Sequence, residues 1–216
     1  ADLKISLGQI DEAEKLLKES NKLSPDNART KLRLAQVLRL KGQAPQAQEL
    51  TRQVLDKIPH DLDALTFLGN LYFEEGKFAQ AKEIFTEVLN FYPMNVNARY
   101  RIGRINLAEG NVDGAFEYFE PLIDSYLKKK KEDKAIGLLG LILTVRNDYI
   151  PALEKLVEIL RETSDFSRLE KVEERLIEEF KKIGEKGKML PYYAELIKLR
   201  PTDEQLAREY RELKKE

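Results

Sequence analysis

The chain has 216 residues, 42% of them hydrophobic, so it can bury the core of one large domain or two small ones. Its 37 Lys and Arg nearly cancel its 38 Asp and Glu, which excludes a global field that would draw it to nucleic acid or acidic lipid. It has no cysteine, which excludes disulfides, thiolate metal sites and cysteine nucleophiles but leaves the compartment open.

A pair of small residues, Gly and then Ala five positions later, recurs along the first half of the chain. The pairs are Gly8 with Ala13, Gly42 with Ala47, Gly76 with Ala81, and Gly110 with Ala115, so the period is 34 residues. Pro25, Pro59 and Pro93 recur with the same period, each midway between two glycines of this series. Three residue types therefore keep one period, which indicates an internal structural repeat.

Each repeat contains two helical patterns of about 14 residues, separated by the glycine and closed by the proline. In the repeat 62–95, apolar residues recur at helical spacing before and after the glycine: Leu65, Leu68 and Tyr72, then Phe78, Phe85 and Val88. Where two helices cross closely, only Gly or Ala at the contact lets the backbones approach to about 8 Å. The pattern therefore predicts antiparallel helical hairpins.

This pattern resembles the tetratricopeptide repeat (TPR) family. The best copy runs from Leu62 to Asn95 and carries Leu68, Gly69, Tyr72, Gly76, Ala81, Phe85 and Pro93 in the register of the family. The resemblance covers residues 1–129 strongly and residues 130–216 more weakly. It implies an all-α fold, a right-handed α-α superhelix of antiparallel helical hairpins, and a protein that binds other proteins.

The first hairpin is incomplete, since only seven residues precede its turn glycine, Gly8. Solenoids normally begin with a complete hairpin or a polar cap, so we expect the chain to be a fragment of a larger assembly factor. Leu3, Ile5 and Leu7 would then form an exposed apolar edge that could pack against another copy. Self-assembly through the terminal hairpins is therefore the alternative to binding of a different protein.

Beyond Ala115 the repeat changes. The equivalent small or apolar position falls at Ala135, Leu169 and Met189, so a shorter step alternates with the earlier one and the period becomes 54. We therefore predict a three-helix unit that occurs twice. The six expected helices span residues 112–130, 133–145, 149–162, 167–183, 188–199 and 203–215.

The chain is thus predicted to have two continuous parts. Residues 1–129 are TPR hairpins, the first truncated and about three complete, and residues 130–216 are divergent TPR-like helices. Ser164 stands where a turn glycine is expected, and Pro121 should kink the helix that contains it. Gly137 and Gly140 lie inside an apolar helix, where close helix packing would explain them.

No residue pattern indicates an enzyme, a metal site or a cofactor site. His60, the only histidine, follows Pro59 in a loop without the second His or Cys that metal and catalytic sites use. Adjacent acids such as Glu74 and Glu75 point about 100° apart on a helix, and no phosphate-binding glycine loop is present. The run Lys128–Lys131 is expected to face the negative end of a helix dipole, since no aromatic residues alternate with it as in nucleic-acid sites.

The TPR resemblance also indicates where a partner would bind. In the family, the second, fifth, sixth, ninth and twelfth positions of each first helix line a concave groove that holds peptides. These positions carry Arg29, Leu32, Arg33, Gln36 and Arg39, then Asp63, Thr66, Phe67, Asn70 and Phe73, then Asn97, Tyr100, Arg101, Arg104 and Leu107. The predicted peptide-binding residues are Arg29, Arg33, Gln36, Phe67, Asn70, Phe73, Tyr100, Arg101 and Arg104.

Five arginines against one aspartate make this predicted groove basic although the chain is nearly neutral. Arginine and aromatic side chains dominate binding hot spots, so the groove suits a segment with acidic and apolar side chains. The alternative is that the arginines pair with neighbouring Glu residues and stay solvated. The clamp that some family members use for a C-terminal carboxylate matches at only one of five places.

We therefore predict a non-enzymatic scaffold or adaptor that binds a peptide or protein segment, with no nucleic-acid partner. No membrane span is expected, because the longest apolar run, Ala135–Val145, has about half of the roughly 20 residues that a span requires. The expected location is the cytoplasm, or the periplasm if the complete protein carries an upstream signal or anchor.

Overall fold

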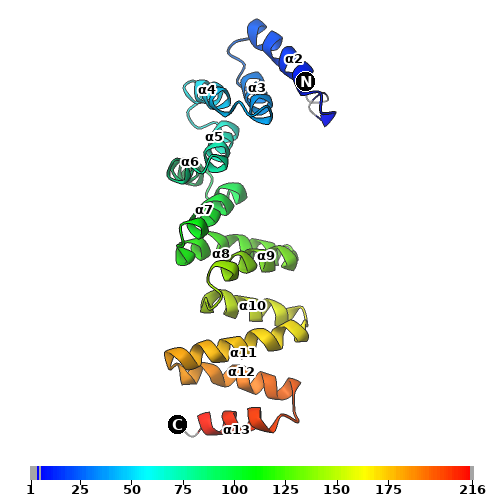
Figure 1. Ribbon diagram of the computed structural model, residues 1–216, viewed down its shortest axis with the longest axis vertical. Coiled ribbons are helices and arrows are strands. Elements are labelled where there is room, and N and C mark those ends of the chain that lie inside the picture. Colours follow the sequence, from blue (N-terminus) through cyan, green and yellow to red (C-terminus); the bar gives the residue numbers. More distant parts are fainter. Residues whose placement is uncertain (1–3, 5, 215–216) are drawn as a thin grey trace. The chain divides into compact units, whose positions relative to one another are not determined.

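The computed structural model describes Lys4 and residues 6–214, and the elements within them are α-helices that follow one another along the chain (Figure 1). They are α2 (Ile10–Leu23), α3 (Ala28–Leu40), α4 (Ala44–Leu55), α5 (Leu62–Glu74), α6 (Phe78–Phe91), α7 (Val96–Ala108), α8 (Val112–Lys128), α9 (Glu132–Val145), α10 (Ile150–Glu162), α11 (Phe166–Ile183), α12 (Lys186–Leu199) and α13 (Glu204–Leu213). The predicted all-α fold is confirmed.

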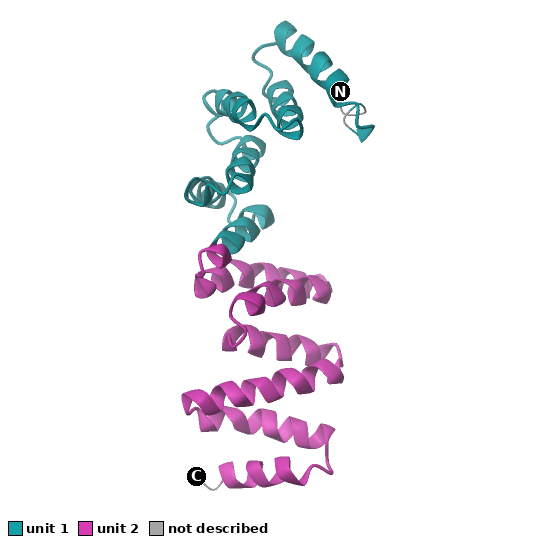
Figure 2. Cartoon of the chain, viewed as in Figure 1, with its two compact units in different colours: residues 1–105 teal, residues 106–216 magenta. Residues whose placement is uncertain are grey.

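The helices fall into two compact units, Ala1–Ile105 and Asn106–Glu216 (Figure 2). In the first unit α2 packs on α3, α3 on α4, α4 on α5 and α5 on α6, and in the second unit each helix from α8 to α13 packs on the next. Packing between sequence neighbours is typical of a helical repeat solenoid. The division into units lies within α7, whereas the change of repeat period near residue 129 stays a prediction.

The predicted turn glycines have a left-handed backbone. Their φ angles are 71° at Gly8, 74° at Gly42, 72° at Gly76 and 76° at Gly110. At the end of α3 the Gly42 N–H bonds to the Arg39 carbonyl and the Gln43 N–H to the Leu38 carbonyl, each at 2.9 Å. This pair of bonds closes a helix at a left-handed residue, a conformation in which glycine avoids the Cβ clash of other residues.

In the later part of the chain, three further residues have a left-handed backbone: Lys130 (φ 53°), Ser164 (φ 55°) and Gly184 (φ 77°). Lys130 was predicted to end the helix 112–130, whereas α8 ends at Lys128 and Lys130 lies in the turn that follows. Ser164 occupies a turn, as expected from the sequence. The helices of this part begin and end within a few residues of the six predicted spans, and Pro121 lies inside α8.

The repeating small residues are buried where helices meet. Ala13, Ala47, Ala81, Ala115 and Ala135 are each 0% exposed. Their methyl groups lie in the hairpin interiors, so a larger side chain at any of them would collide with the facing helix.

The glycines inside helices differ in whether a neighbouring side chain requires them. A Cβ added at Gly69 would lie 2.8 Å from Cε1 of Phe85, so only glycine admits this buried ring against α5. No atom lies within 4 Å of a Cβ built at Gly137 or Gly140. The prediction that close packing explains these two glycines is wrong, because both are on an exposed face of α9.

The longest apolar run forms part of α9, which buries Ala135, Leu138, Leu139 and Ile142. The helix is therefore a core helix of the second unit. Among the residues that the structure describes, no helix combines the length and apolar character that a membrane crossing requires.

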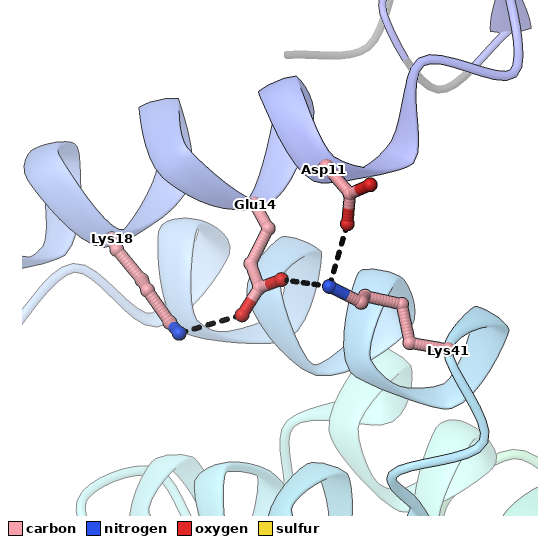
Figure 3. Close-up of polar contacts among 4 residues, drawn as sticks. All are labelled: Asp11, Glu14, Lys18 and Lys41. Carbon is pink, nitrogen blue, oxygen red and sulfur yellow. Dashed lines mark hydrogen bonds and ion pairs between the residues drawn. The ribbon is translucent and has the colours of Figure 1, made fainter.

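A charged network joins α2 to the end of α3 (Figure 3). Lys41 Nζ lies 2.7 Å from Asp11 Oδ1 and 2.6 Å from Glu14 Oε2, and Lys18 Nζ lies 2.6 Å from Glu14 Oε1. Hydrogen bonds from Lys18 and Lys41 lower the pKa of the largely buried Glu14. Lys41 is also the C-cap residue of α3, so its positive charge lies near the negative end of that helix dipole.

The predicted apolar edge at the start of the chain is described only in part. Leu3 and Ile5 lie outside the described residues, and Leu7 is 62% exposed. Self-assembly through this edge therefore stays a prediction.

Candidate protein-binding groove

Three first helices of the repeats begin in the same way. Asn27 Oδ1 accepts a hydrogen bond from the Thr30 N–H (3.0 Å), Asp61 Oδ1 from the Ala64 N–H (2.8 Å), and Asn95 Oδ1 from the Ala98 N–H (2.9 Å). These N-caps recur with the period of the repeat, so α3, α5 and α7 start at the same repeat position and equal positions along them present the same face. The caps were not predicted, although an Asn or Asp before each first helix at the repeat period is a readable signal.

The larger cleft, of about 850 Å³, lies along α3 and α5. It is lined by Ala28, Arg29, Leu32, Arg33 and Gln36, by Asp61, Leu62, Asp63, Thr66, Phe67 and Asn70, and by Asn95. Each predicted groove position of α3 and α5, apart from Arg39 and Phe73, is among them. The structure therefore brings together side chains that the repeat register had placed on one face.

A second cleft, of about 570 Å³, adjoins the first and shares Arg33, Gln36, Phe67 and Asn70 with it. It adds Ser6, Arg39, Leu40, Glu74 and Arg101. Because the clefts share four side chains, they form one continuous surface, which we call the α3–α5 groove. It belongs entirely to the first compact unit.

The groove is less basic than the sequence predicts. Arg39 Nη1 lies 3.0 and 3.2 Å from the two oxygens of Glu74, so this pair is neutral overall. Asp61 also lines the groove, while its carboxylate caps α5. The predicted count of five arginines against one aspartate left out both acids. Asp61 precedes the helix, and Glu74 is one position beyond the last groove position considered.

The remaining predicted residues are Phe73 of α5 and Tyr100, Arg101 and Arg104 of α7, and aromatic contacts hold the two arginines. The Arg101 guanidinium lies over the ring of Phe73, 4.6 Å from its centroid, and Phe73 in turn contacts the ring of Phe78. Arg104 Nη1 donates to the Tyr100 hydroxyl at 3.0 Å, with the guanidinium 5.8 Å from the ring centroid. Of the nine predicted peptide-binding residues, Phe73, Tyr100 and Arg104 do not line either cleft, whereas the other six do.

Two buried polar atoms of the groove have no hydrogen-bond partner within the described part of the chain. They are Oδ1 of Asn70 and Nε of Arg101. An unpaired buried polar group destabilises the folded state by about 1–3 kcal/mol, so its presence in a cleft calls for a functional reason.

The residues weighed for chemistry are engaged in structural contacts. His60 is exposed, with Nδ1 3.3 Å from Glu87 Oε1 and its ring 4.1 Å from that of Phe91. Lys129 is the C-cap of α8, at the negative end of its dipole. Over Lys4 and residues 6–214, no group of three or more His, Asp or Glu side chains is arranged to hold a metal ion.

The helical hairpins, their glycine turns and the groove on the first helices together define an all-α helical repeat solenoid of the tetratricopeptide type. The chain thus has the fold of tetratricopeptide repeat proteins. Residues 1–100 match the model of the cytochrome c-type biogenesis protein H TPR domain. No curated protein sequence matches the chain.

Solved structures with this fold cover most of the chain. A tetratricopeptide repeat protein from Parabacteroides merdae has a TM-score of 0.62 and 17% identity over 90% of this chain and 75% of its own. A putative kinesin light chain with TPR-like repeats from Podosopora anserina has a TM-score of 0.61 and 19% identity over 77% and 92%. The pilF protein of Pseudomonas aeruginosa has a TM-score of 0.51 and 16% identity over 98% and 91%. At these identities the likeness is one of fold alone.

Proposed function

We propose that the chain is a non-enzymatic scaffold that binds a segment of another protein in the α3–α5 groove. Proteins with this fold generally bind protein partners. The observation that carries the proposal is the pair of adjoining clefts, which share Arg33, Gln36, Phe67 and Asn70 and so present one continuous surface. A ring, two amides and a guanidinium side by side can contact both the main chain and the side chains of a peptide.

The groove is suited to a short segment. The α3 helix has 13 residues and is therefore about 20 Å long, which equals the length of about six residues of an extended peptide. The packed helices hold the lining side chains in place before a partner arrives. Less ordering is then needed on binding, which raises affinity.

The match of residues 1–100 to the TPR domain of cytochrome c-type biogenesis protein H supports the assembly of c-type cytochromes as the process served. Deletion of the gene is then expected to reduce the level of haem-stained c-type cytochromes in the cells that naturally make the chain. Normal cytochrome levels would contradict this process without affecting the proposal that the groove binds protein.

Site-specific photo-crosslinking tests the groove itself. A benzophenone amino acid at Gln36, which lines both clefts, is expected to cross-link a partner protein, and mass spectrometry of the adduct identifies the bound segment. The same label at Arg208, an exposed residue of α13, is the matched control and should give no such adduct.

The outcomes are distinct. An adduct at position 36 that is absent from position 208 supports groove binding. Equal labelling at both positions, or no adduct at position 36, overturns it. An adduct between two copies of this chain at position 36 replaces the proposal with self-assembly.

A further inference from the structure

We infer that the bound segment is acidic and that Arg101 and Arg104 of α7 receive its carboxylates. The inference rests on the proposed function, because it names the chemistry of the segment that the groove holds. The observation that carries it is that, in the described portion of the chain, aromatic rings and no carboxylate hold these two guanidinium groups.

Many arginines of the chain already pair with carboxylates. Such pairs are Arg39 with Glu74, Arg146 with Asp113, Arg161 with Glu173 and Glu195, Arg168 with Asp165, and Arg200 with Glu170 and Glu174. In each pair the guanidinium charge is balanced by an acid of the same chain. These arginines are therefore poor receptors for a foreign carboxylate.

The arginines of α7 are different. Arg101 lies on the face of Phe73, and Arg104 lies beside the ring of Tyr100 and bonds to its hydroxyl. Arg99 donates to the main-chain carbonyl of Pro93 at 2.7 Å. Within the described residues none of the three pairs with a carboxylate, and α7 itself contains no Asp or Glu.

An aromatic face holds a guanidinium in place without cancelling its charge. The attraction comes from the ring quadrupole, which carries no net charge. Arg101 and Arg104 are therefore oriented in advance yet keep a full positive charge, whereas Arg39 is oriented and neutralised. A carboxylate that reaches them forms charge-assisted hydrogen bonds, which are about twice as strong as neutral ones.

The two positively charged groups are placed to act with the groove. Arg101 lines it together with Arg33, Phe67 and Asn70, so a segment that fills the groove meets this guanidinium. Arg104 follows one helical turn later, with about 5–6 Å between the Cβ atoms of such neighbours. In an extended segment, side chains two positions apart lie on one face about 6.6 Å apart. Two acidic residues separated by one residue therefore match the arginine pair.

A nucleic acid could in principle supply anions to the same arginines. The structure favours a protein segment, because Leu32 and Phe67 offer apolar contacts and Gln36 and Asn70 offer amides within the same groove. Single-stranded nucleic acids use a charged groove that follows a long backbone, whereas the chain as a whole has a net charge of −1.

Selection from a phage-displayed library of short random peptides against the 216-residue chain tests the inference. We expect the selected peptides to be enriched in Asp and Glu, with pairs of acids separated by one residue. Replacing both acids of a selected peptide by their amides, and separately Arg101→Gln or Arg104→Gln in the chain, should each weaken binding about tenfold to a hundredfold. Binding is measured by fluorescence anisotropy.

Two control variants make the result specific. Arg168→Gln removes an arginine of α11 that Asp165 already neutralises, and Arg208→Gln removes an exposed arginine of α13; both lie outside the groove and should leave the affinity nearly unchanged. Thermal unfolding of each variant shows that it is folded, and Arg101→Lys should restore only part of the affinity, because an ammonium lacks the planar fork.

The outcomes separate the inference of an acidic segment from the proposal that the groove binds protein. Selected peptides without an acidic bias, or with affinities that Arg101→Gln and Arg104→Gln do not change, overturn the inference and leave groove binding intact. A library that yields no binders counts against the proposed function itself. Tighter binding of an oligonucleotide than of any selected peptide would replace the acidic protein segment by a nucleic acid.

Discussion

Glu173 of α11 is a carboxyl group that the fold removes from water. Its side chain is 0% exposed, and its Oε1 lies 3.2 Å from Nη2 of Arg161. Its Oε2 has no partner in the described part of the chain, and Arg161 also pairs with Glu195. One guanidinium thus serves two carboxylates, and burial together with the charge of Glu195 raises the pKa of Glu173 to about 7.

This raised pKa makes stability depend on pH. The ordinary pKa is 4.5, so between pH 4.5 and about 7 the folded chain holds a proton that the unfolded chain has released. The free energy of unfolding should therefore fall as the pH rises through this range. At about 1.4 kcal/mol per pKa unit, the loss is about 3 kcal/mol. Denaturant unfolding of Glu173→Gln, which stays neutral, should show higher stability than the natural chain at about pH 8 and little difference at about pH 4.5.

Glu178, an exposed residue on the same helix, provides the control. The Glu178→Gln variant should keep the pH dependence of the natural chain. If Glu173→Gln kept it as well, the dependence would belong to another group and the interpretation of the buried carboxyl would be wrong.

Alanine substitutions at Gly69 and Gly137 test whether packing requires glycine at each of these helical positions. Gly69→Ala places a methyl group 2.8 Å from the fully buried Phe85 ring, so we expect a loss of about 1–3 kcal/mol in the free energy of unfolding. Gly137→Ala meets no atom within 4 Å and gains helix propensity, so we expect a gain of about 0.5–1 kcal/mol. Denaturant unfolding of both variants measures the difference, and equal effects would contradict the packing argument.

At the scale of the element, the turns of the hairpins need a left-handed residue, and two of them hold a residue other than glycine. Ser164, with φ 55°, carries the Cβ strain that glycine avoids. Ser164→Gly should therefore raise the free energy of unfolding by about 0.5–1 kcal/mol, because the relieved strain exceeds the added flexibility of the unfolded chain.

Ser164→Ala is the matched control for this turn. Alanine removes the hydroxyl but keeps the Cβ, so it should not reproduce the gain in the free energy of unfolding. Denaturant unfolding of both variants measures this. A gain in both variants would show that the serine side chain, and not the backbone conformation, destabilises the turn.

The helical elements were largely predictable from the sequence, because each hairpin needs a small residue at its crossing and a left-handed residue at its turn. Ala13, Ala47, Ala81 and Ala115 mark the crossings and are all fully buried. The later turn at Lys130 was not recognisable by residue type, since lysine is not a turn signal. Lys130 was instead predicted to end the helix 112–130, whereas α8 ends at Lys128 and Lys130 lies in the turn.

At the scale of the whole molecule, the repeat register predicted which positions share the face of the groove. It did not predict the contacts between their side chains. Six of the nine predicted binding residues line the α3–α5 groove, because equal repeat positions share one face. The pairing of Arg39 with Glu74 and the packing of Arg101 on Phe73 were beyond the sequence, since they depend on side-chain conformations across two helices. The arginine charges that remain available could therefore be identified only in the structure.

A solenoid in which each helix packs on its sequence neighbours should unfold locally. Leu139 of α9 is 0% exposed, and α9 packs on α8 and α10. Leu139→Ala is therefore expected to lower stability by about 2–5 kcal/mol and to speed amide hydrogen exchange most in α8, α9 and α10. Exchange in α12 and α13, which are farther along the stack, should change less, and the exposed Ile183→Ala should change neither region. Hydrogen-exchange mass spectrometry measures this, and a uniform increase from α8 to α13 would mean that the second unit unfolds as a single cooperative body.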